Sequence, residues 1–209
     1  MILGYIAYIG TDIQFTRLTD KDRRLGLIFL HVYDIPYADL SAYEGIIITN
    51  FVEEAFLLEN QTILKRYLDQ RGVIFSQVEN SLPWLPGCGK WVRSPIPIKD
   101  REFHYTEPVH QLFQGIDLYD LNYKKGVKGF LTRGYFDRIP LNAEVLLTDQ
   151  DKQPVLYIDR HTTKGVIIAG AGTALYGYGI QENSTKYLSE QILSYIREKA
   201  KKSRKGAKK

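Results

Sequence analysis

Hydrophobic residues in the first part of the chain gather in four short runs, at residues 2–9, 25–32, 45–49 and 73–78. Each run is too short for a typical helix and is apolar at successive positions, which is the pattern of a strand buried on both faces. The polar segment at residues 13–24, between the first two runs, has room for a short helix or an ordered loop. We therefore predict four central strands before residue 80.

Between the third and fourth runs the hydrophobic period changes from that of a strand to that of a helix. Apolar residues recur at helical spacing from Val52 to Leu68, and charged residues lie largely on the opposite face. Acidic residues stand in the first turn and basic residues in the last, and Gly72 follows as an expected C-terminal cap. Residues 40–85 therefore predict a strand, one amphipathic helix and a second, parallel strand joined by a right-handed crossover.

The pattern becomes irregular after the fourth strand. Residues 83–100 contain four prolines, two glycines and both tryptophans, which predicts a long ordered loop rather than a periodic element. A short helix is expected at residues 108–115, because Pro108 suits a first helical turn and Gly115 suits an end.

Strand-like runs return in the last third of the chain, at residues 143–148, 153–158 and 165–169, after a less regular one at 130–136. The polar residues between the first two of these three runs predict a tight antiparallel hairpin. An apolar stripe that begins at Tyr187 predicts a final helix packed on the sheet.

The length and composition fit one globular domain. Of 209 residues, 44% are hydrophobic and 25% are charged, and no apolar run approaches the ~20 residues of a membrane span. The N-terminus lacks the basic region of a signal peptide, and the single cysteine excludes an internal disulfide. We expect a cytoplasmic α/β domain over residues 1–196 and no contact with a membrane.

The net charge of +4 is unevenly distributed. Residues 197–209 carry eight Lys or Arg and one Glu, a net +7, whereas residues 1–196 carry 20 basic and 23 acidic residues, a net −3. We interpret residues 197–209 as a flexible basic tail that extends the last helix. The tail could also attract nucleic acid, but it has no aromatic or amide side chain that could read a base.

Four segments give the chain its resemblance to the class I glutamine amidotransferase-like superfamily. They are residues 40–49 (LSAYEGIIIT, similar to L-x-x-Y-D-x-I-I-I), 64–76 (a helix and strand joined by RGVI, similar to G-G-x-hydrophobic), 110–116 (HQLFQGI, similar to H-P-L-F-x-G-I) and the hairpin with last strand at 143–168. The nearest match is the branch without amidotransferase activity that includes the ThuA-like proteins. The resemblance implies a flavodoxin-like, three-layer α/β fold with a mostly parallel sheet and a C-terminal antiparallel hairpin.

The resemblance also locates the turn where a catalytic cysteine would lie. Amidotransferases place it as G-x-C-x-G directly after a buried strand, beside amides that hold an oxyanion. The corresponding turn here, residues 79–81, reads ENS, and the family's His-x-Glu pair is replaced by GAGTA at residues 170–174. Cys88 lies ten residues beyond the strand, with no helix signal after it that would lower its pKa. We interpret Cys88 as a loop cysteine, and the sequence disfavours the amidotransferase reaction.

No cofactor or metal is predicted. The Gly170-Ala171-Gly172 sequence lacks the third glycine of a dinucleotide fingerprint and closes the sheet instead of opening a βαβ unit, so we interpret it as a tight turn. The four histidines show no metal-ligand spacing. His31 suits a packed strand, His110 suits the cap of a short helix, and His104 follows the tryptophan loop, where it could contact a ligand.

Ligands of open α/β sheets bind beyond the carboxyl ends of the strands. The side chains expected at or over this edge as ligand contacts are Thr11, Asn50, Asn80, Trp84 and Trp91. Two aromatic rings beside small polar groups suit a sugar, another polar ring or a protein surface, although both tryptophans could instead pin the loop to the core.

Three functional hypotheses follow. The first is a non-catalytic domain that binds a small polar ligand or a protein partner, as part of a larger assembly. The second is a ThuA-like hydrolase or sugar-modifying enzyme, which requires Asp12, Glu79 and His104 to converge as acid/base groups in one pocket. The third, which has the least support, is a nucleic-acid-associated protein that acts through residues 197–209.

Overall fold

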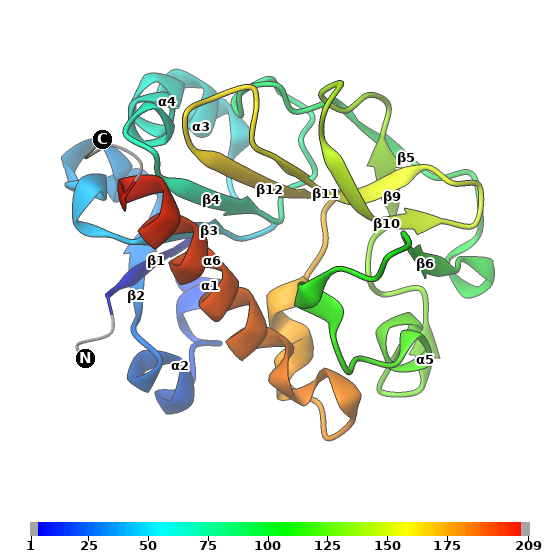
Figure 1. The fold of residues 1–209 in the computed structure, drawn as a ribbon. Helices are drawn as coiled ribbons and strands as arrows, with labels where there is room; N and C mark the ends of the chain where they lie inside the picture. The colour runs from blue at the N-terminus through cyan, green and yellow to red at the C-terminus, as the bar shows by residue number, and fades with distance from the viewer. Residues whose placement is uncertain (1–3, 206–209) are drawn as a thin grey trace.

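An eight-stranded sheet runs through the centre of the protein (Figure 1). The structure is a computed structural model that describes residues 4–205. The strand order is β2-β1-β3-β4-β12-β11-β10-β6. The bounds are β1 Ile6–Gly10, β2 Leu27–His31, β3 Gly45–Ile48, β4 Val73–Ser76, β6 Phe103–Tyr105, β10 Glu144–Asp149, β11 Pro154–Asp159 and β12 Val166–Gly170.

The sheet is parallel from β2 to β12 and antiparallel from β12 to β6. The four early strands, the β3–β4 crossover and the β10–β11 hairpin are therefore confirmed. The flavodoxin-like α/β fold with a mostly parallel sheet is also confirmed.

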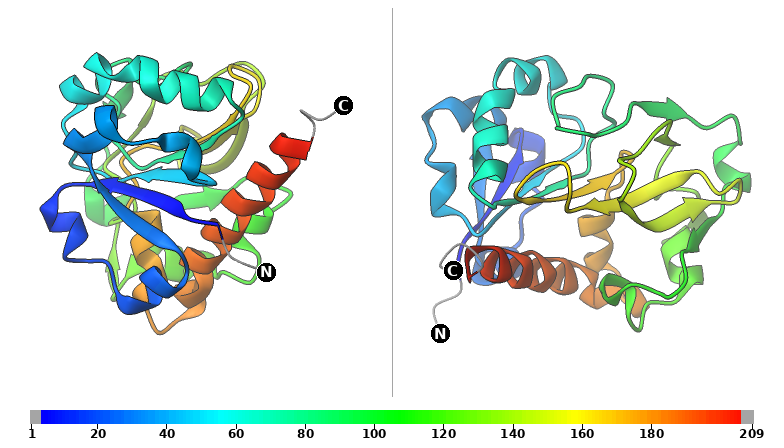
Figure 2. Two further views of the ribbon diagram at one scale, coloured as in Figure 1. Left: turned by 90° about the vertical axis from the view of Figure 1, so that its left-hand side faces the viewer. Right: turned by 45° about the horizontal axis from the view of Figure 1, so that its top comes forward.

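Helices cover both faces of the sheet, which gives three layers (Figure 2). The α-helices are α1 Asp12–Phe15, α2 Asp20–Arg24, α3 Glu54–Glu59, α4 Gln61–Asp69, α5 Leu118–Asn122 and α6 Leu188–Lys205. The 3-10 helices are η1 Val32–Tyr37, η2 Leu40–Ala42, η3 Ile98–Asp100, η4 Gln111–Phe113, η5 Leu175–Ile180 and η6 Ser184–Tyr187.

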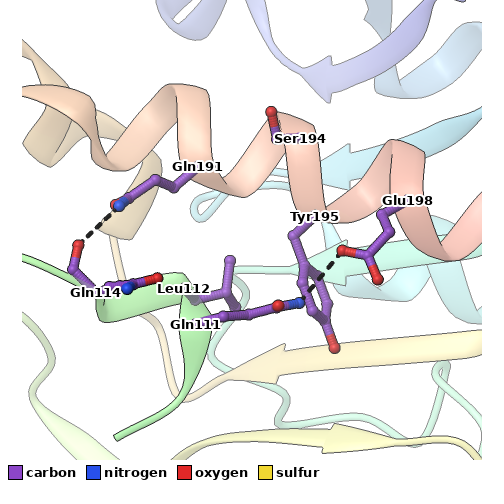
Figure 3. Close-up of a pocket in the computed structure, with 7 residues that line it drawn as sticks. All are labelled: Gln111, Leu112, Gln114, Gln191, Ser194, Tyr195 and Glu198. Carbon is purple, nitrogen blue, oxygen red and sulfur yellow. Dashed lines mark hydrogen bonds between the residues drawn. The ribbon is translucent and has the colours of Figure 1, made fainter.

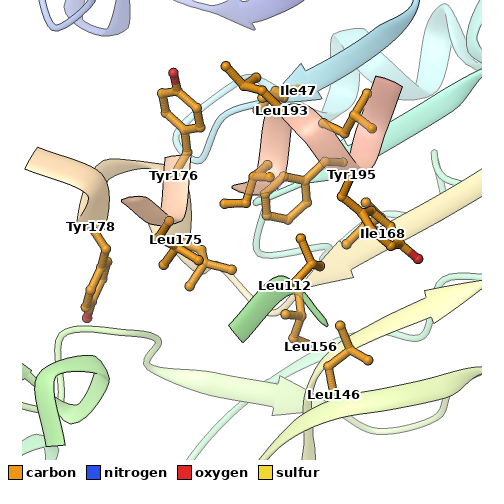
Figure 4. Packing of buried hydrophobic residues seen from close by; sticks show 14 of the residues in the cluster. Ile47, Leu112, Leu146, Leu156, Ile168, Leu175, Tyr176, Tyr178, Leu193 and Tyr195 are labelled. Carbon is orange, nitrogen blue, oxygen red and sulfur yellow. The ribbon is translucent and has the colours of Figure 1, made fainter. Parts of the chain in front are cut away.

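Successive residues of the central strands alternate between two hydrophobic clusters. In β3, Ile47 packs with α6 on one face, and Ile46 and Ile48 pack with α3 and α4 on the other. Figure 4 shows the first cluster, in which Leu193 and Tyr195 of α6 lie over Ile47 and Ile168. Both faces of the sheet are therefore buried away from water, which explains why the sequences of these strands are continuously apolar.

The single helix expected at residues 52–68 is wrong, because the structure has two helices that meet at Asn60. Asn60 leaves helical geometry at φ −101° and ψ 13°, and its side-chain amide donates to the carbonyl of Phe56 at 2.9 Å. A side chain that bonds the backbone in this way competes with the helix ladder. Hydrophobic spacing runs through the break, so periodicity alone does not reveal it.

Gly72 is not the left-handed cap expected after this helix. Arg71 holds the left-handed conformation, at φ 67°. A Cβ at Gly72 would lie 2.2 Å from the ring of Tyr67, so this glycine is needed for the close approach of the ring. A glycine after a helix therefore has two possible uses, which the sequence does not distinguish.

The chain between β4 and β10 forms an excursion at one end of the sheet. It contains the antiparallel pair β5 Trp91–Arg93 with β9 Gly134–Phe136, and the pair β7 Tyr123–Lys124 with β8 Val127–Lys128. It also supplies β6, the edge strand of the main sheet beside β10. The short helix expected at residues 108–115 is only η4, and the side chain of His110 caps it by accepting from the amide of Leu112 at 3.2 Å.

The last helix continues into the basic segment, because α6 ends at Lys205. Arg197 is buried and donates to the carbonyls of Gly4 and Leu25. Lys199 and Lys202 both pair with Glu198. Residues 206–209 of the predicted tail lie outside the described residues. Among residues 4–205, no helix combines the length and apolar character needed to cross a membrane.

We expect Gly165→Ala to destabilise the protein strongly. A Cβ at this position would lie 2.3 Å from the carbonyl oxygen of Gly72, where β4 and β12 begin their pairing. Overpacking against fixed backbone typically costs about 1–3 kcal/mol. The control is Gly177→Ala, whose Cβ would have only Lys124 Nζ nearby, at 3.9 Å. Urea unfolding measures the stability of both variants. Equal unfolding midpoints would contradict the close approach of the Gly165 and Gly72 backbones.

Candidate functional site

A crevice of about 250 Å³ opens at the carboxyl ends of β3, β4 and β12. The residues that line it are Asn50, Phe51, Glu79, Trp91, Arg93, Phe130, Thr132, Arg133, Gly172 and Ala174. The first three come from the turns after β3 and β4, the last two follow β12, and the others belong to the excursion. The edge of the sheet that the sequence predicted as a ligand site is therefore hollow.

Three of the predicted site residues meet in this crevice, namely Asn50, Glu79 and Trp91. Trp91 reaches it because its amide donates to the carbonyl of Asn80 at 2.8 Å, which fastens β5 beside the turn after β4. Gly172 lies close to Glu79, since a Cβ on Gly172 would be 2.4 Å from the Glu79 Cγ. Its φ of 71° confirms that Gly170-Ala171-Gly172 is a tight turn.

The other three predicted ligand contacts have structural roles. Trp84 is fully buried in the cluster beneath α3 and α4, so it pins the loop as the alternative interpretation expected. Asn80 is buried and its amide donates to Cys88 Sγ. Thr11 donates from both its amide and its hydroxyl to the side-chain carbonyl of Gln14, at 2.9 and 2.6 Å.

The structure does not bring together the three acid/base candidates. Asp12 follows β1, its side chain is 93% exposed, and its carboxylate lies 3.9 Å from His31 Nε2. His104 is exposed on β6, the edge strand at the far end of the sheet from β2. Only Glu79 lines the crevice. Sequence order could not place His104, because β6 joins the sheet beside β10 instead of following β4.

Backbone amides in the turn after β4 bind a carboxylate from another part of the same chain. Glu54, the first residue of α3, accepts from the amides of Ser81 and Leu82 at 2.8 and 2.9 Å through the same oxygen, Oε2. Two convergent amides are the arrangement that stabilises an oxyanion in acyl-transfer enzymes. Here Glu54 occupies both donors, so they are not available to a substrate.

Cys88 is a poor nucleophile in this environment. Burial raises the pKa of its thiol to about 11, although the nearby polar groups of Tyr157 and Asn80 act in the opposite direction. Since the thiolate is the reactive form, a raised pKa leaves the group neutral at physiological pH. The interpretation of Cys88 as a loop cysteine is consistent with this placement.

Sequence reasoning missed the two arginines of the crevice, Arg93 and Arg133. They come together because β5 pairs with β9, where Arg93 is opposite Gly134 and the amide of Ser94 donates to the carbonyl of Arg133. Burial raises the pKa of Glu79, and the charges of Arg133 and Arg93 oppose that rise. The nearby Glu54 reinforces it.

A second hollow of about 250 Å³ lies between η4 and α6 (Figure 3). Its amide side chains hold the two elements together, because Gln191 donates to the carbonyl of Gln114 at 2.9 Å and Gln111 donates to Glu198 at 3.4 Å. None of the predicted site residues lines it. No group of three His, Cys, Asp or Glu that could hold a metal occurs in the described part of the chain.

No protein-family model and no curated protein sequence matches this chain. Several solved structures are similar to it. A putative GMP synthase subunit from Thermoplasma acidophilum has a TM-score of 0.57 at 12% identity, over 100% of both chains. A glutamine amidotransferase from Thermotoga maritima has a TM-score of 0.49 at 9% identity, over 98% of this chain and 93% of that one. The mmIFT52 N-terminal domain has a TM-score of 0.44 at 12% identity, over 92% and 97%.

The fold resembles that of the putative GMP synthase subunit. At 12% identity the similarity establishes the fold alone, because one fold supports many unrelated functions. The fold expected from the sequence resemblance is thus confirmed. The ThuA-like branch stays a prediction.

We expect the Cys88 thiol to react slowly with Ellman's reagent in the folded protein. The rise from the ordinary thiol pKa of 9.0 to about 11 lowers the thiolate fraction at pH 8 about a hundredfold. The native protein should therefore react at least ~100-fold more slowly than the protein unfolded in urea, and its rate should keep rising with pH up to about 11. Absorbance at several pH values measures both, and a rate that levels off near pH 7 would contradict the raised pKa.

Proposed function

We propose that this chain is a non-catalytic binding domain that holds a small polar ligand in the crevice above β3, β4 and β12. One observation carries the proposal. The crevice gathers the polar side chains Asn50 and Glu79 with the ring of Trp91, while the turn amides beside it are bound by Glu54. The geometry therefore supports ligand contact and disfavours acyl transfer.

The volume of the crevice limits the ligand class. Sites for drug-sized molecules span roughly 300–1,000 Å³, so a crevice of about 250 Å³ suits a smaller, metabolite-sized molecule. Phe51 and Phe130 are exposed aromatic residues at the crevice, and Trp91 is half-buried in its wall. A ligand with polar groups and a flat or apolar body matches this lining.

Protein-observed NMR tests this proposal. Titration with a library of small polar molecules should shift the amide signals of Asn50, Glu79 and Gly172. Ala174→Trp should weaken that binding at least about tenfold, because the larger ring fills the crevice. Leu141→Trp is the matched control, since Leu141 is 96% exposed and lies outside the crevice. Ligands that shift other parts of the protein but not the crevice would refute the assignment.

The same samples separate binding from catalysis. A non-catalytic domain leaves the resonances of an excess ligand unchanged overnight. Conversion of the ligand that is lost in Glu79→Gln would instead support the ThuA-like hydrolase or sugar-modifying enzyme, because Glu79 is the one predicted acid/base residue in the crevice.

A protein partner is a second candidate, supported by a row of aromatic rings along the edge strand β2. Neighbouring rings lie 4.9 to 6.3 Å apart, and the row consists of Phe15, Phe29, His31, Tyr33 and Phe56. Within the described residues β2 pairs only with β1, so its other edge is open to a further strand. The similar fold of a putative synthase subunit is compatible with a place in a larger assembly.

A photo-crosslinking residue at position 33 tests the partner surface. Benzoylphenylalanine in place of Tyr33, which is half-exposed, should give a specific crosslinked species in cells that express the protein. The matched control replaces Tyr187, which is similarly exposed on η6. Equal crosslinking patterns at the two positions would remove the support for this surface.

The hypothesis that the basic segment binds nucleic acid has less support than the ligand and protein-partner hypotheses. Within the described part of the basic segment, Arg197 binds backbone carbonyls and two lysines pair with Glu198. These charges act inside the chain and are therefore only partly available to phosphate groups.

A further inference from the structure

We propose that the ligand of the crevice is a small organic anion, and that Arg93 and Arg133 bind its carboxylate or phosphate group. This inference rests on the proposed function and specifies the chemical class of the ligand. Three features support it: two exposed arginines whose side chains make no hydrogen bond or ion pair among the described residues, a rigid support beneath one of them, and the balance of charge and apolar surface in the crevice.

Arg93 and Arg133 both line the crevice, where Glu79 is the acidic group near them. Both residues are exposed, and neither guanidinium makes a hydrogen bond or ion pair within residues 4–205. Both also line a neighbouring hollow of about 190 Å³, formed with the prolines of residues 95–97. Each guanidinium carries a fork of N–H donors that matches the oxygens of a carboxylate or phosphate.

The backbone that carries Arg133 is braced from below. Arg101 is 1% exposed, and its guanidinium donates to the carbonyls of Thr132 and Gly134, the two neighbours of Arg133, at 2.6 and 3.3 Å. Asp149, also 1% exposed, lies 3.7 Å from Arg101 and ties this guanidinium to the β10–β11 hairpin. Because the buried guanidinium binds the carbonyls on both sides of Arg133, it fixes the backbone there and hence the direction of the Arg133 side chain. Such support is the usual way to preorganise a binding group.

The charges in the crevice leave a positive excess. Glu79 is the single acidic residue of the lining, against Arg93 and Arg133. Trp91 and Phe130 add aromatic surface beside the arginines. An anion with a flat or apolar body would therefore satisfy both the charges and the rings, whereas an uncharged ligand would leave two arginines unpaired.

Matched pairs of probes test the charge of the ligand. Benzoate and benzamide have nearly the same shape and differ in charge, and phenyl phosphate and inorganic phosphate share a phosphate and differ in the ring. By NMR titration at constant ionic strength, we expect benzoate or phenyl phosphate to bind at the crevice about tenfold more tightly than benzamide, because bonds to a charged acceptor are the stronger ones. Whichever of the two binds better identifies a carboxylate or a phosphate ligand. Phenyl phosphate should also exceed inorganic phosphate, because the ring contacts Trp91 and Phe130.

Variants of the crevice test the residues. Arg93→Gln and Arg133→Gln should each weaken binding of the better anion about tenfold. Arg138→Gln is the matched control, because its side chain is 88% exposed and lies outside the crevice. Glu79→Gln should tighten binding of the anion, since it removes the opposing charge, whereas general damage to the crevice would weaken it. Thermal unfolding checks that each variant is folded, and Arg133→Lys supplies a milder change if Arg133→Gln is not.

The outcomes separate this inference from the proposed function. Equal binding of benzoate, phenyl phosphate and benzamide at the crevice would overturn the anion class and leave a polar ligand site. Anion binding that is unchanged in both arginine variants would overturn the assignment of the residues. If no molecule of the wider polar library shifts the crevice either, the proposed function falls together with this inference.

Discussion

The parallel pairing of β4 with β12 is the contact that joins the two parts of this protein. It links the four N-terminal strands to the C-terminal hairpin across the whole excursion. The pairing needs Gly165, because a Cβ there would lie 2.3 Å from the carbonyl oxygen of Gly72. The same pairing places the turns after the two strands side by side, with Gly172 against Glu79. The crevice therefore depends on this one register, because a shift by one residue would exchange the side chains that pack on the two faces and displace the two turns relative to each other.

The excursion between β4 and β10 converts this edge of the sheet into a possible binding site. It returns over the edge through β5 and β9 and contributes Trp91, Arg93 and Arg133. Its position relative to the sheet is held by Arg101 and Asp149. A buried ion pair is costly unless its remaining groups are also satisfied. Here Arg101 bonds two carbonyls and Asp149 accepts from the amides of Asp151 and Gln153, which offsets part of that cost.

The turn after β4 differs from the nucleophile-bearing turn of an acyl-transfer enzyme. In acyl-transfer enzymes such a turn exposes a nucleophile beside free amides. In this chain the carboxylate of Glu54 binds the amides, and the thiol of Cys88 is buried with a raised pKa. Cys88, Ser81 and Leu82 all lie outside the lining of the crevice. Function therefore has to be argued from the residues of the crevice and not from the fold.

The sequence by itself determined the four N-terminal strands, the C-terminal hairpin and the strand that follows it. These features depend on local periodicity and on turn residues, which are readable in any short window, as at residues 45–49 and 149–152. Of the site residues that it predicted, Asn50, Glu79 and Trp91 line the crevice. Only the tertiary structure decided that Trp84 is core, that His104 lies at a distant edge and that Arg93 meets Arg133. Those outcomes depend on pairing between residues far apart in the chain, and the hydrophobic pattern of either partner carries no information about the other.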